Sequence, residues 1–217
     1  MKRLARTLAN ALGFEVTRLT PRQRSLLAGN PALRYRHLVV ADAIMGAGQI
    51  TLAEARFLAE LMRGLASPGP IVEIGTLFGW STSVIVLAKD PERELITVDN
   101  YSWNPFGLPP ALHEATTHAA LADAIAGERV RVLATNAADF YAGYAGPPPA
   151  LVFIDGDHSY EAIAADIRGS RQIRAQVICG HDYAPKIFPG IARAVDEAGG
   201  IARREGTLWV LASGAAR

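Results

Sequence analysis

The sequence has little cysteine, almost no net charge and no long apolar run. Its single cysteine, Cys179, can form neither an internal disulfide nor a cysteine-based zinc site. Lys plus Arg number 22 against 21 for Asp plus Glu, so the net charge of +1 lacks the basic excess of a nucleic-acid-binding protein. No apolar stretch reaches the roughly 18–20 residues that a membrane span needs. These absences predict a cytoplasmic protein with no nucleic-acid partner and no integral membrane segment.

The first 24 residues combine a basic bias with leucine at helical spacing. Six basic residues stand there against a single acidic one, Glu15. Leu4, Leu8 and Leu12 recur at intervals of four, which is typical of an amphipathic helix. The apolar stretch around them is short and interrupted by polar residues, unlike the core of a signal peptide. We expect a basic helix that packs on its own domain, on a second subunit or on an anionic membrane surface.

The pattern of the chain changes at residues 66–70, where Ser, Pro and Gly cluster. Before this point, residues 35–45 show helical apolar spacing, and Thr51 with Glu54 forms a capping box. Residues 1–66 are therefore predicted to be a helical N-terminal extension that serves as a lid or as the surface of a homodimer. Residues 67–217 are predicted to form the main domain.

Short apolar strands alternate with helices throughout this domain. Strands are expected at 71–74, 95–98, 130–133, 151–154, 176–179, 201–204 and 208–211. Helices are expected at 81–88, 113–126, 159–173 and 191–198. The alternation predicts an α/β fold with a Rossmann-like, doubly wound, seven-stranded and mostly parallel sheet. The last two strands are joined by a tight turn and form a C-terminal antiparallel hairpin. Ligands of such a sheet bind at the carboxyl ends of its strands.

A glycine-containing turn follows the first of these strands. Gly75 allows the backbone to turn sharply and a ligand to approach it, and Glu73 precedes it by two positions. Asp99 ends the second strand, where its carboxylate can accept the hydroxyls of a ribose. A dinucleotide would need three glycines, whereas this turn has only Gly75 and Gly79. An acid is unfavourable beside a diphosphate but favourable beside a cationic ligand such as S-adenosylmethionine.

Four parts of the sequence carry a resemblance to known proteins: residues 72–79, the strand end at Asp99, residues 153–160 and residues 180–183. Together they resemble class I S-adenosylmethionine-dependent methyltransferases. More narrowly, they resemble the small bacterial branch that includes sugar and antibiotic O-methyltransferases and cephalosporin-hydroxylase-like proteins. The resemblance covers residues 70–211 and leaves the helical first third without a usable motif.

The resemblance implies a set of cofactor-binding residues. The glycine turn would hold the methionine part of S-adenosylmethionine, the second acid its ribose, and a polar position after the third strand its adenine. The residues implied are Glu73, Gly75, Thr76, Gly79, Ser81, Asp99, Asn100, Asn136, Ala137 and Asp155.

Acidic and histidine side chains gather after the fourth and fifth predicted strands. They are Asp155, Asp157, His158, His181 and Asp182. If the two strands are neighbours, about 4.8 Å apart, the acids lie close enough to share one small cation. Without a cation or another bound partner they would repel one another and raise each other's pKa values. The cluster therefore indicates a function rather than packing.

Metal-dependent O-methyltransferases of the catechol type suggest roles for this cluster. They place one metal-binding acid after the fourth strand and an adjacent pair after the fifth, which here correspond to Asp155 and to His181 with Asp182. The family pair is usually Asp-Asn or Asp-Asp, so His181 is a departure. An imidazole beside carboxylates favours manganese, zinc or iron over magnesium, or indicates no metal at all.

His158 stands three residues after Asp155, at the start of the next predicted helix. The catechol-type enzymes place their general base at that offset, so the resemblance makes His158 and Asp155 the candidate catalytic residues. A helix N-terminus disfavours imidazolium, which keeps histidine neutral and able to accept a proton. The alternative is that His158 caps the helix or orients Asp182.

The sequence thus predicts a methyltransferase that acts on a hydroxyl of a small molecule or sugar, with a divalent metal as an open alternative. The acceptor pocket is expected from residues 101–110, residues 184–190 and the helical first third of the chain. Trp103 and Phe106, in the first of these segments, would stack on a ring or close over the cofactor. Three alternatives stay open: a metal-independent N- or C-methyltransferase, a nicotinamide-dependent oxidoreductase and a non-catalytic protein of the same fold.

Overall fold

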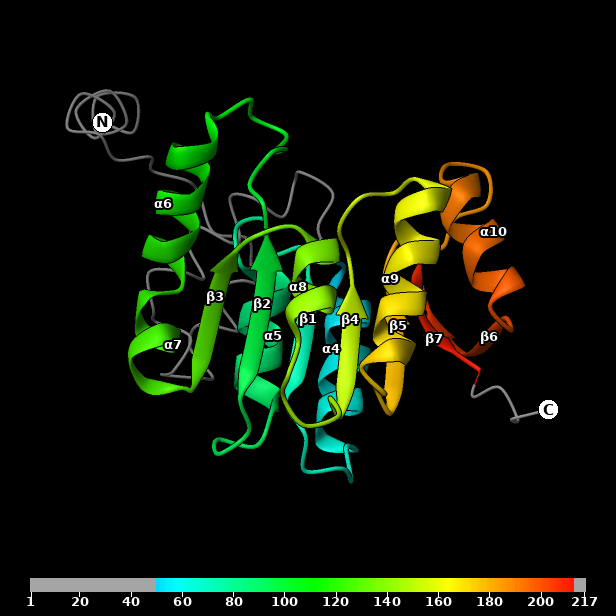
Figure 1. Cartoon of the computed structure of the whole chain (residues 1–217), viewed down its shortest axis with the longest axis horizontal. Helices are drawn as coiled ribbons and strands as arrows, with labels where there is room; N and C mark the ends of the chain where they lie inside the picture. Colours follow the sequence, from blue (N-terminus) through cyan, green and yellow to red (C-terminus); the bar gives the residue numbers. More distant parts are fainter. Residues whose placement is uncertain (1–49, 213–217) are drawn as a thin grey trace, which may run out of the picture. The chain divides into compact units, whose positions relative to one another are not determined.

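The computed structural model of the chain describes residues 50–212, which build a seven-stranded sheet in the order β3-β2-β1-β4-β5-β7-β6 (Figure 1). Strands β1 to β5 are parallel to one another, and β7 runs antiparallel to both β5 and β6. The predicted fold class and its closing hairpin are confirmed. The strands are β1 (Ile71–Ile74), β2 (Leu95–Asp99), β3 (Val130–Ala134), β4 (Leu151–Ile154), β5 (Val177–Gly180), β6 (Ile201–Glu205) and β7 (Leu208–Leu211).

Helices cover both faces of the sheet (Figure 1). They are α4 (Leu52–Arg63), α5 (Trp80–Ala88), α6 (Pro110–Ala120), α7 (Ala122–Gly127), α8 (Ala137–Gly143), α9 (Tyr160–Gln172) and α10 (Pro189–Glu197). Helix α4 packs on α5 behind the sheet, α8 and α9 pack together in front of it, and α10 packs on α9. Within residues 50–212, no helix combines the length and the apolar character that crossing a bilayer requires.

The central strands are apolar at nearly every position because helices cover them on both sides. Val72 pairs with Val152, and Ile74 with Ile154, and all four side chains are buried. Since β1, β2, β4 and β5 are parallel, their carboxyl ends meet at one edge of the sheet, the upper edge in Figure 1. The residues that follow these strands are therefore brought together there.

The capping box predicted at Thr51 and Glu54 is present at the start of α4. The Glu54 carboxylate accepts the N–H of Thr51 at 2.7 Å, and the Thr51 hydroxyl accepts the N–H of Glu54 at 3.3 Å. The other predictions for the N-terminal extension, the basic helix and the helix at residues 35–45, lie outside the described residues. The division of the chain at residue 66 and the homodimer stay predictions.

Two helices differ from the sequence-based expectation. The single helix predicted for residues 113–126 is two helices, α6 and α7, which meet at Leu121 (φ −98°, ψ 7°). Leu121 leaves helical geometry and is buried with its side chain directly against Gly79. Helix α8 was not expected, and it begins where Asn136 accepts the N–H of Asp139 at 2.8 Å. The burial of Leu121 thus sets the break between α6 and α7, and the Asn136 cap sets the start of α8. Neither feature produces a strong periodic pattern of apolar residues in the sequence.

Replacing Gly75 by alanine is expected to lower the free energy of unfolding by roughly 1–3 kcal/mol. Gly75 has a φ of 95°, and a Cβ there would overlap the backbone carbonyl oxygen of Asp155. Chemical denaturation measures the loss. Gly143→Ala is the matched control, because its added Cβ meets nothing within 4 Å. Equal stabilities for the two variants would show that the strand ends of β1 and β4 are not tightly apposed.

Candidate active site

The turn after β1 is tied to the end of β2 by the Asp99 carboxylate. Asp99 Oδ2 accepts the backbone N–H groups of Thr76 and Leu77 at 2.9 and 2.8 Å. Asp99 Oδ1 accepts the N–H of Tyr101 at 2.7 Å. Leu77 and Tyr101 both have left-handed backbones, with φ values of 47° and 55°. Such strain in non-glycine residues persists where the surroundings enforce it and is concentrated at functional sites.

These bonds bear on the ligand that the turn can accept. A dinucleotide places its pyrophosphate on the free N–H groups of such a turn. Here the N–H groups of Thr76 and Leu77 are used by a carboxylate, which counts against the oxidoreductase alternative. A carboxylate has about four acceptor positions. Three of those on Asp99 are occupied by backbone donors, so one is left for a ribose hydroxyl.

Glu73 lies beneath this turn and is fully buried. Its two carboxylate oxygens accept the hydroxyls of Ser81 and Thr82, each at 2.6 Å, from the first turn of α5. Burial away from water raises the pKa of Glu73 to about 7, against the lowering effect of these hydrogen bonds. Ser81, predicted to bind the cofactor, is thus itself buried and serves to hold Glu73. Thr76 is buried as well, with its hydroxyl bonded to that of Thr97.

The residues predicted to face ribose and adenine lie at the same edge of the sheet. Asn136 follows β3 and caps α8, and its side-chain N–H donates to Asp139 at 2.7 Å. Ala137 is the first residue of α8. Asn100, after β2, accepts the N–H of Ser102 at 3.0 Å and is exposed. All three therefore lie at the carboxyl ends of β2 and β3, on the β2 side of the glycine turn.

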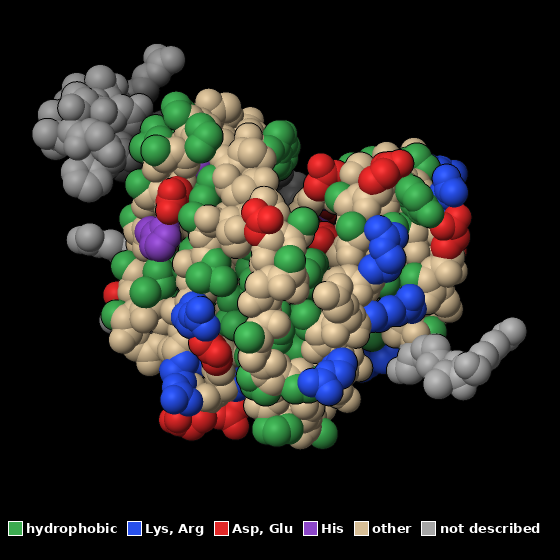
Figure 2. All heavy atoms as spheres, viewed as in Figure 1, with side chains coloured by type: hydrophobic (Ala, Val, Ile, Leu, Met, Phe, Trp, Pro, Cys, Tyr) green, Lys and Arg blue, Asp and Glu red, His purple; other side chains and the backbone are tan. Residues whose placement is uncertain are grey.

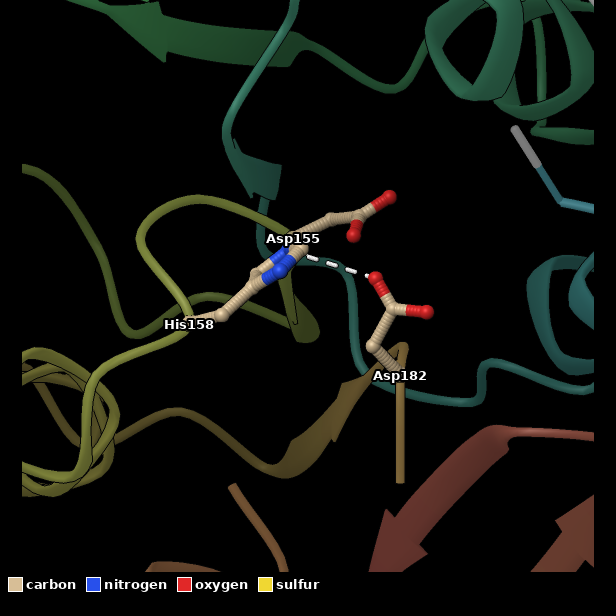
Figure 3. A group of neighbouring side chains, drawn as sticks. All are labelled: Asp155, His158 and Asp182. Atoms are coloured by element: carbon tan, nitrogen blue, oxygen red, sulfur yellow. Dashed lines mark ion pairs between the residues drawn. The ribbon is translucent and has the colours of Figure 1, made fainter. Parts of the chain in front are cut away.

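On the other side of that turn, three side chains converge. Asp155 follows β4, His158 precedes α9 and Asp182 follows β5, and Figure 3 shows them pointing toward one another. Each offers a ligand atom within 4.8 Å of the other two. His158 Nε2 lies 3.2 Å from Asp182 Oδ2. Asp182 has a left-handed backbone with a φ of 59°, which is a third strained position at this edge.

His181 lies beneath this group and is buried among acids. Its Nδ1 lies 3.5 Å from Asp155 Oδ1 and 3.4 Å from Asp182 Oδ2. Its Nε2 lies 2.9 Å from the Thr207 hydroxyl and 3.5 Å from Glu54 Oε1. Burial lowers the pKa of His181, but the neighbouring carboxylates of Asp155 and Asp182 outweigh it and raise the pKa to about 11. The predicted set of Asp155, His181 and Asp182 is thus brought together.

Residues 72–183, more than half of the chain, match the family described as methyltransferase domain. The chain belongs to that family. The match spans the glycine turn, both acids beside it and the cluster at Asp155, His158 and Asp182. The prediction of a class I methyltransferase is confirmed.

Solved structures of low sequence identity share the fold of this methyltransferase. Cofactor-bound Rv0187 from MTB is 22% identical over 84% of this chain and 87% of its own, with a TM-score of 0.59. An O-methyltransferase from Bacillus cereus in complex with SAH is 21% identical over 74% of each chain, with a TM-score of 0.56. CalS11, a TDP-rhamnose 3'-O-methyltransferase of calicheamicin biosynthesis, is 18% identical over 98% and 92%, with a TM-score of 0.54. No curated protein sequence matches the chain.

Two residues of the methyltransferase site were missed by sequence analysis. Glu54 was assigned only to the cap of α4, yet its carboxylate also accepts the N–H and the hydroxyl of Thr207. Burial raises the pKa of Glu54, but the hydrogen bonds from Thr51 and Thr207 outweigh it and lower the pKa to about 2. Glu54 and Thr207 are 153 positions apart, and both lie outside the family-matched residues. No sequence pattern of either residue signals the contact.

Other polar residues near the site are used in local structure. Asp157 accepts the N–H of Ser159 at 2.7 Å and so shapes the turn before α9. That hydrogen bond lowers the pKa of Asp157. Tyr160 donates its hydroxyl to Glu197 at 2.6 Å, and Tyr183 donates to Asp196 on the same helix. Figure 2 shows the methyltransferase hollowed at its upper edge, between the side of α6 and the side of α9 and α10, with acidic side chains at the margin.

Proposed function

We propose that this protein transfers the methyl group of S-adenosylmethionine to a hydroxyl of a small molecule or sugar. The observation that carries the proposal is the pairing of two sites at one edge of the sheet. Glu73 and Asp99 frame a cofactor position at the glycine turn, and His158 is paired with Asp182 beside it. Asp155 follows β4, the strand that lies between β1 and β5.

The cofactor position fits S-adenosylmethionine by its chemistry. Asp99 and Asp155 give it an anionic character, to which Glu73 adds as the pH rises through its pKa of about 7. This charge suits a ligand with a sulfonium and an ammonium group. Asp99 has one acceptor position left for a ribose hydroxyl, and Asn136 and Ala137 are proposed to face adenine. S-adenosylmethionine supplies an activated methyl carbon, so the protein's task is to position the acceptor and to remove its proton.

His158 is proposed as the general base. When its Nε2–H is donated to Asp182, Nδ1 carries the lone pair that takes the proton of the acceptor hydroxyl. The acceptor oxygen then forms its bond to the methyl carbon as the bond from that carbon to sulfur breaks, and the proton remains on His158. The carboxylate of Asp182 stabilises the imidazolium that forms.

A divalent metal is proposed at Asp155, His181 and Asp182. These residues offer two carboxylate oxygens and one imidazole nitrogen, a donor set that suits manganese, zinc or iron. A metal ion there would lower the pKa of an acceptor hydroxyl and orient a pair of adjacent oxygens.

The acceptor is proposed to be a sugar or a small natural product bound at the rim of the hollow. Trp103 and Phe106 are 67% and 55% exposed in the segment between β2 and α6. The ring of Phe106 packs at a tilt against the buried Phe78, with ring centroids 5.7 Å apart. Exposed aromatic side chains on a loop above a site suit a sugar or aromatic ring. The fold shared with CalS11, named for a TDP-rhamnose acceptor, supports the sugar assignment.

Calorimetric titration with S-adenosylhomocysteine tests the cofactor assignment. The wild-type protein is expected to bind it, and Asp99→Ala is expected to weaken binding about 10- to 100-fold, because a charged acceptor and the order of the turn are both lost. Asp123→Ala, at an exposed acid in α7, is the matched control and should bind as the wild type does. Absence of binding to the wild-type protein would refute the proposed function.

A further inference from the structure

His181 is held by a directional chain of hydrogen bonds that begins outside the family-matched residues. Thr207, in the turn between β6 and β7, donates its N–H and its hydroxyl to Glu54 Oε1 at 2.6 and 2.8 Å. A carboxylate accepts hydrogen bonds, so the single hydroxyl hydrogen of Thr207 is used there. The Thr207 oxygen is therefore an acceptor toward His181 Nε2, 2.9 Å away. It follows that Nε2 carries a hydrogen.

This tautomer leaves the other ring nitrogen facing two acids. In the neutral ring, the lone pair of Nδ1 points at Asp155 Oδ1 and Asp182 Oδ2, at 3.5 and 3.4 Å. That arrangement is repulsive unless a positive charge lies between the three atoms, either a proton held on Nδ1 or a metal ion in its place. Ligand atoms that each lie about 2.0–2.2 Å from one metal ion are roughly 3 Å or slightly more apart. The distances from Nδ1 to the two carboxylate oxygens are therefore close to the spacing that ligands of one metal ion would have.

We propose that Glu54 and Thr207 are positioning residues that fix the Nε2–H tautomer of His181 and so make its Nδ1 a metal ligand. The proposal rests on the metal-assisted form of the proposed function. Histidines that bind metal ions are commonly oriented in this way, by a hydrogen bond from the second ring nitrogen to a carboxylate or another acceptor. Here the acceptor comes from the β6–β7 turn, and the charge behind it comes from the first turn of α4.

A second set of possible metal ligands shares both aspartates with the first set but has a different histidine. Asp155, His158 and Asp182 also lie close enough to hold an ion, with His158 in place of His181. The His181 side chain is 5% exposed and bonded at Nε2, whereas that of His158 is 36% exposed. A ligand that is already fixed loses less conformational entropy on binding. His181 is therefore favoured, which leaves His158 free to act as the base.

Histidine nitrogen chemical shifts distinguish the two sets directly. The chain has five histidines, so the full-length protein labelled with ¹⁵N-histidine gives few signals, and His181→Gln and His158→Gln variants assign them. Zinc is the probe because it is diamagnetic. We expect zinc to shift Nδ1 of His181 while its Nε2 keeps its hydrogen. Zinc bound at Nε2 of His181, or at His158 alone, would overturn the proposal.

Thr207→Val tests the positioning role. It removes the hydroxyl and leaves both the backbone N–H of residue 207 and the cap of α4 in place. We expect it to weaken zinc binding about 10- to 100-fold, measured by calorimetry. Thr207→Ser keeps the hydroxyl and should bind zinc as the wild type does. Glu54→Gln keeps an acceptor for the cap of α4 and is expected to weaken zinc binding as Thr207→Val does. It is the variant to measure if Thr207→Val does not fold. Equal affinity in wild type, Thr207→Val and Glu54→Gln would overturn the proposal.

Titration of the same samples with S-adenosylhomocysteine separates this inference from the proposed function. A wild-type protein that binds S-adenosylhomocysteine but not zinc would overturn the inference and leave methyl transfer in place. A protein that binds neither would overturn both.

Discussion

Replacing His158 by glutamine is expected to lower kcat about 10²- to 10⁴-fold, while the KM for S-adenosylmethionine changes little. Glutamine keeps a donor for Asp182 but has no group that can accept the proton of an acceptor hydroxyl. The His158 ring also packs edge-on against Phe188 at 4.7 Å, and the flat amide preserves part of that contact. Transfer of a labelled methyl group to nucleotide sugars and catechols, followed on the best acceptor, measures the rate.

The control for this substitution is His118→Gln, an exposed histidine on α6. It makes the same chemical change outside the site and should leave kcat unaltered. Asp182→Asn should lower kcat as well, because the amide weakly stabilises an imidazolium and binds metal poorly. If His158→Gln retained the wild-type rate, the general base would have to be another group, and Asp155 would be the next to test.

Replacing Glu73 by glutamine is expected to stabilise the protein at pH 8 by up to about 3 kcal/mol and to leave its stability unchanged below pH 4.5. The pKa of Glu73 is raised from 4.5 to about 7 by burial. Between pH 4.5 and about pH 7, Glu73 therefore keeps its proton in the folded state but has lost it in the unfolded state. The folded protein is favoured at low pH, and that contribution disappears as the pH rises through about 7. Glutamine is neutral at every pH and avoids the loss.

Urea denaturation of the wild type and of Glu73→Gln at pH 5, 6, 7 and 8 measures this difference. Asp166 in α9 also has its pKa raised to about 7 by burial, so the wild-type profile contains both contributions. Comparison with Asp166→Asn assigns them separately. Glu73→Gln should in addition weaken S-adenosylmethionine binding, and Asp166→Asn should not. A stability gain that did not vary with pH would show that Glu73 is not protonated in the folded state.

Strands β1, β4 and β7 could be predicted closely because each is a short, largely apolar run ended by a polar or small residue. The bounds of β1, β4 and β7 agree with the prediction. Glu73 in β1, Asp99 at the end of β2 and Asp155 after β4 mark the edge where ligands are expected to bind. This regularity follows from burial on both sides, which leaves few polar residues inside a central strand.

The hydrogen bonds that link the residues of the site could not be predicted from the sequence. Asp99 was expected to serve ribose, yet most of its acceptor positions hold the turn after β1. Ser81 was expected to touch the cofactor, yet it supports Glu73. The role of Asp99 depends on the pairing of β1 with β2, and the role of Ser81 depends on how α5 packs against β1. The contact of Glu54 with Thr207 depends on the hairpin folding back beside α4, and no local periodicity records it.

The position of β7 has a consequence for the growing chain on the ribosome. β7 is synthesised after every other strand, but it lies inside the sheet, between β5 and β6. Until it emerges, the outer edge of β5 has no partner, and an unpaired edge invites association with other chains. The indole N–H of Trp209, which donates to the backbone carbonyl of His181 at 3.0 Å, arrives in the same step. The pairing of this strand therefore covers the open edge of β5 and fixes the backbone of His181 in the same step.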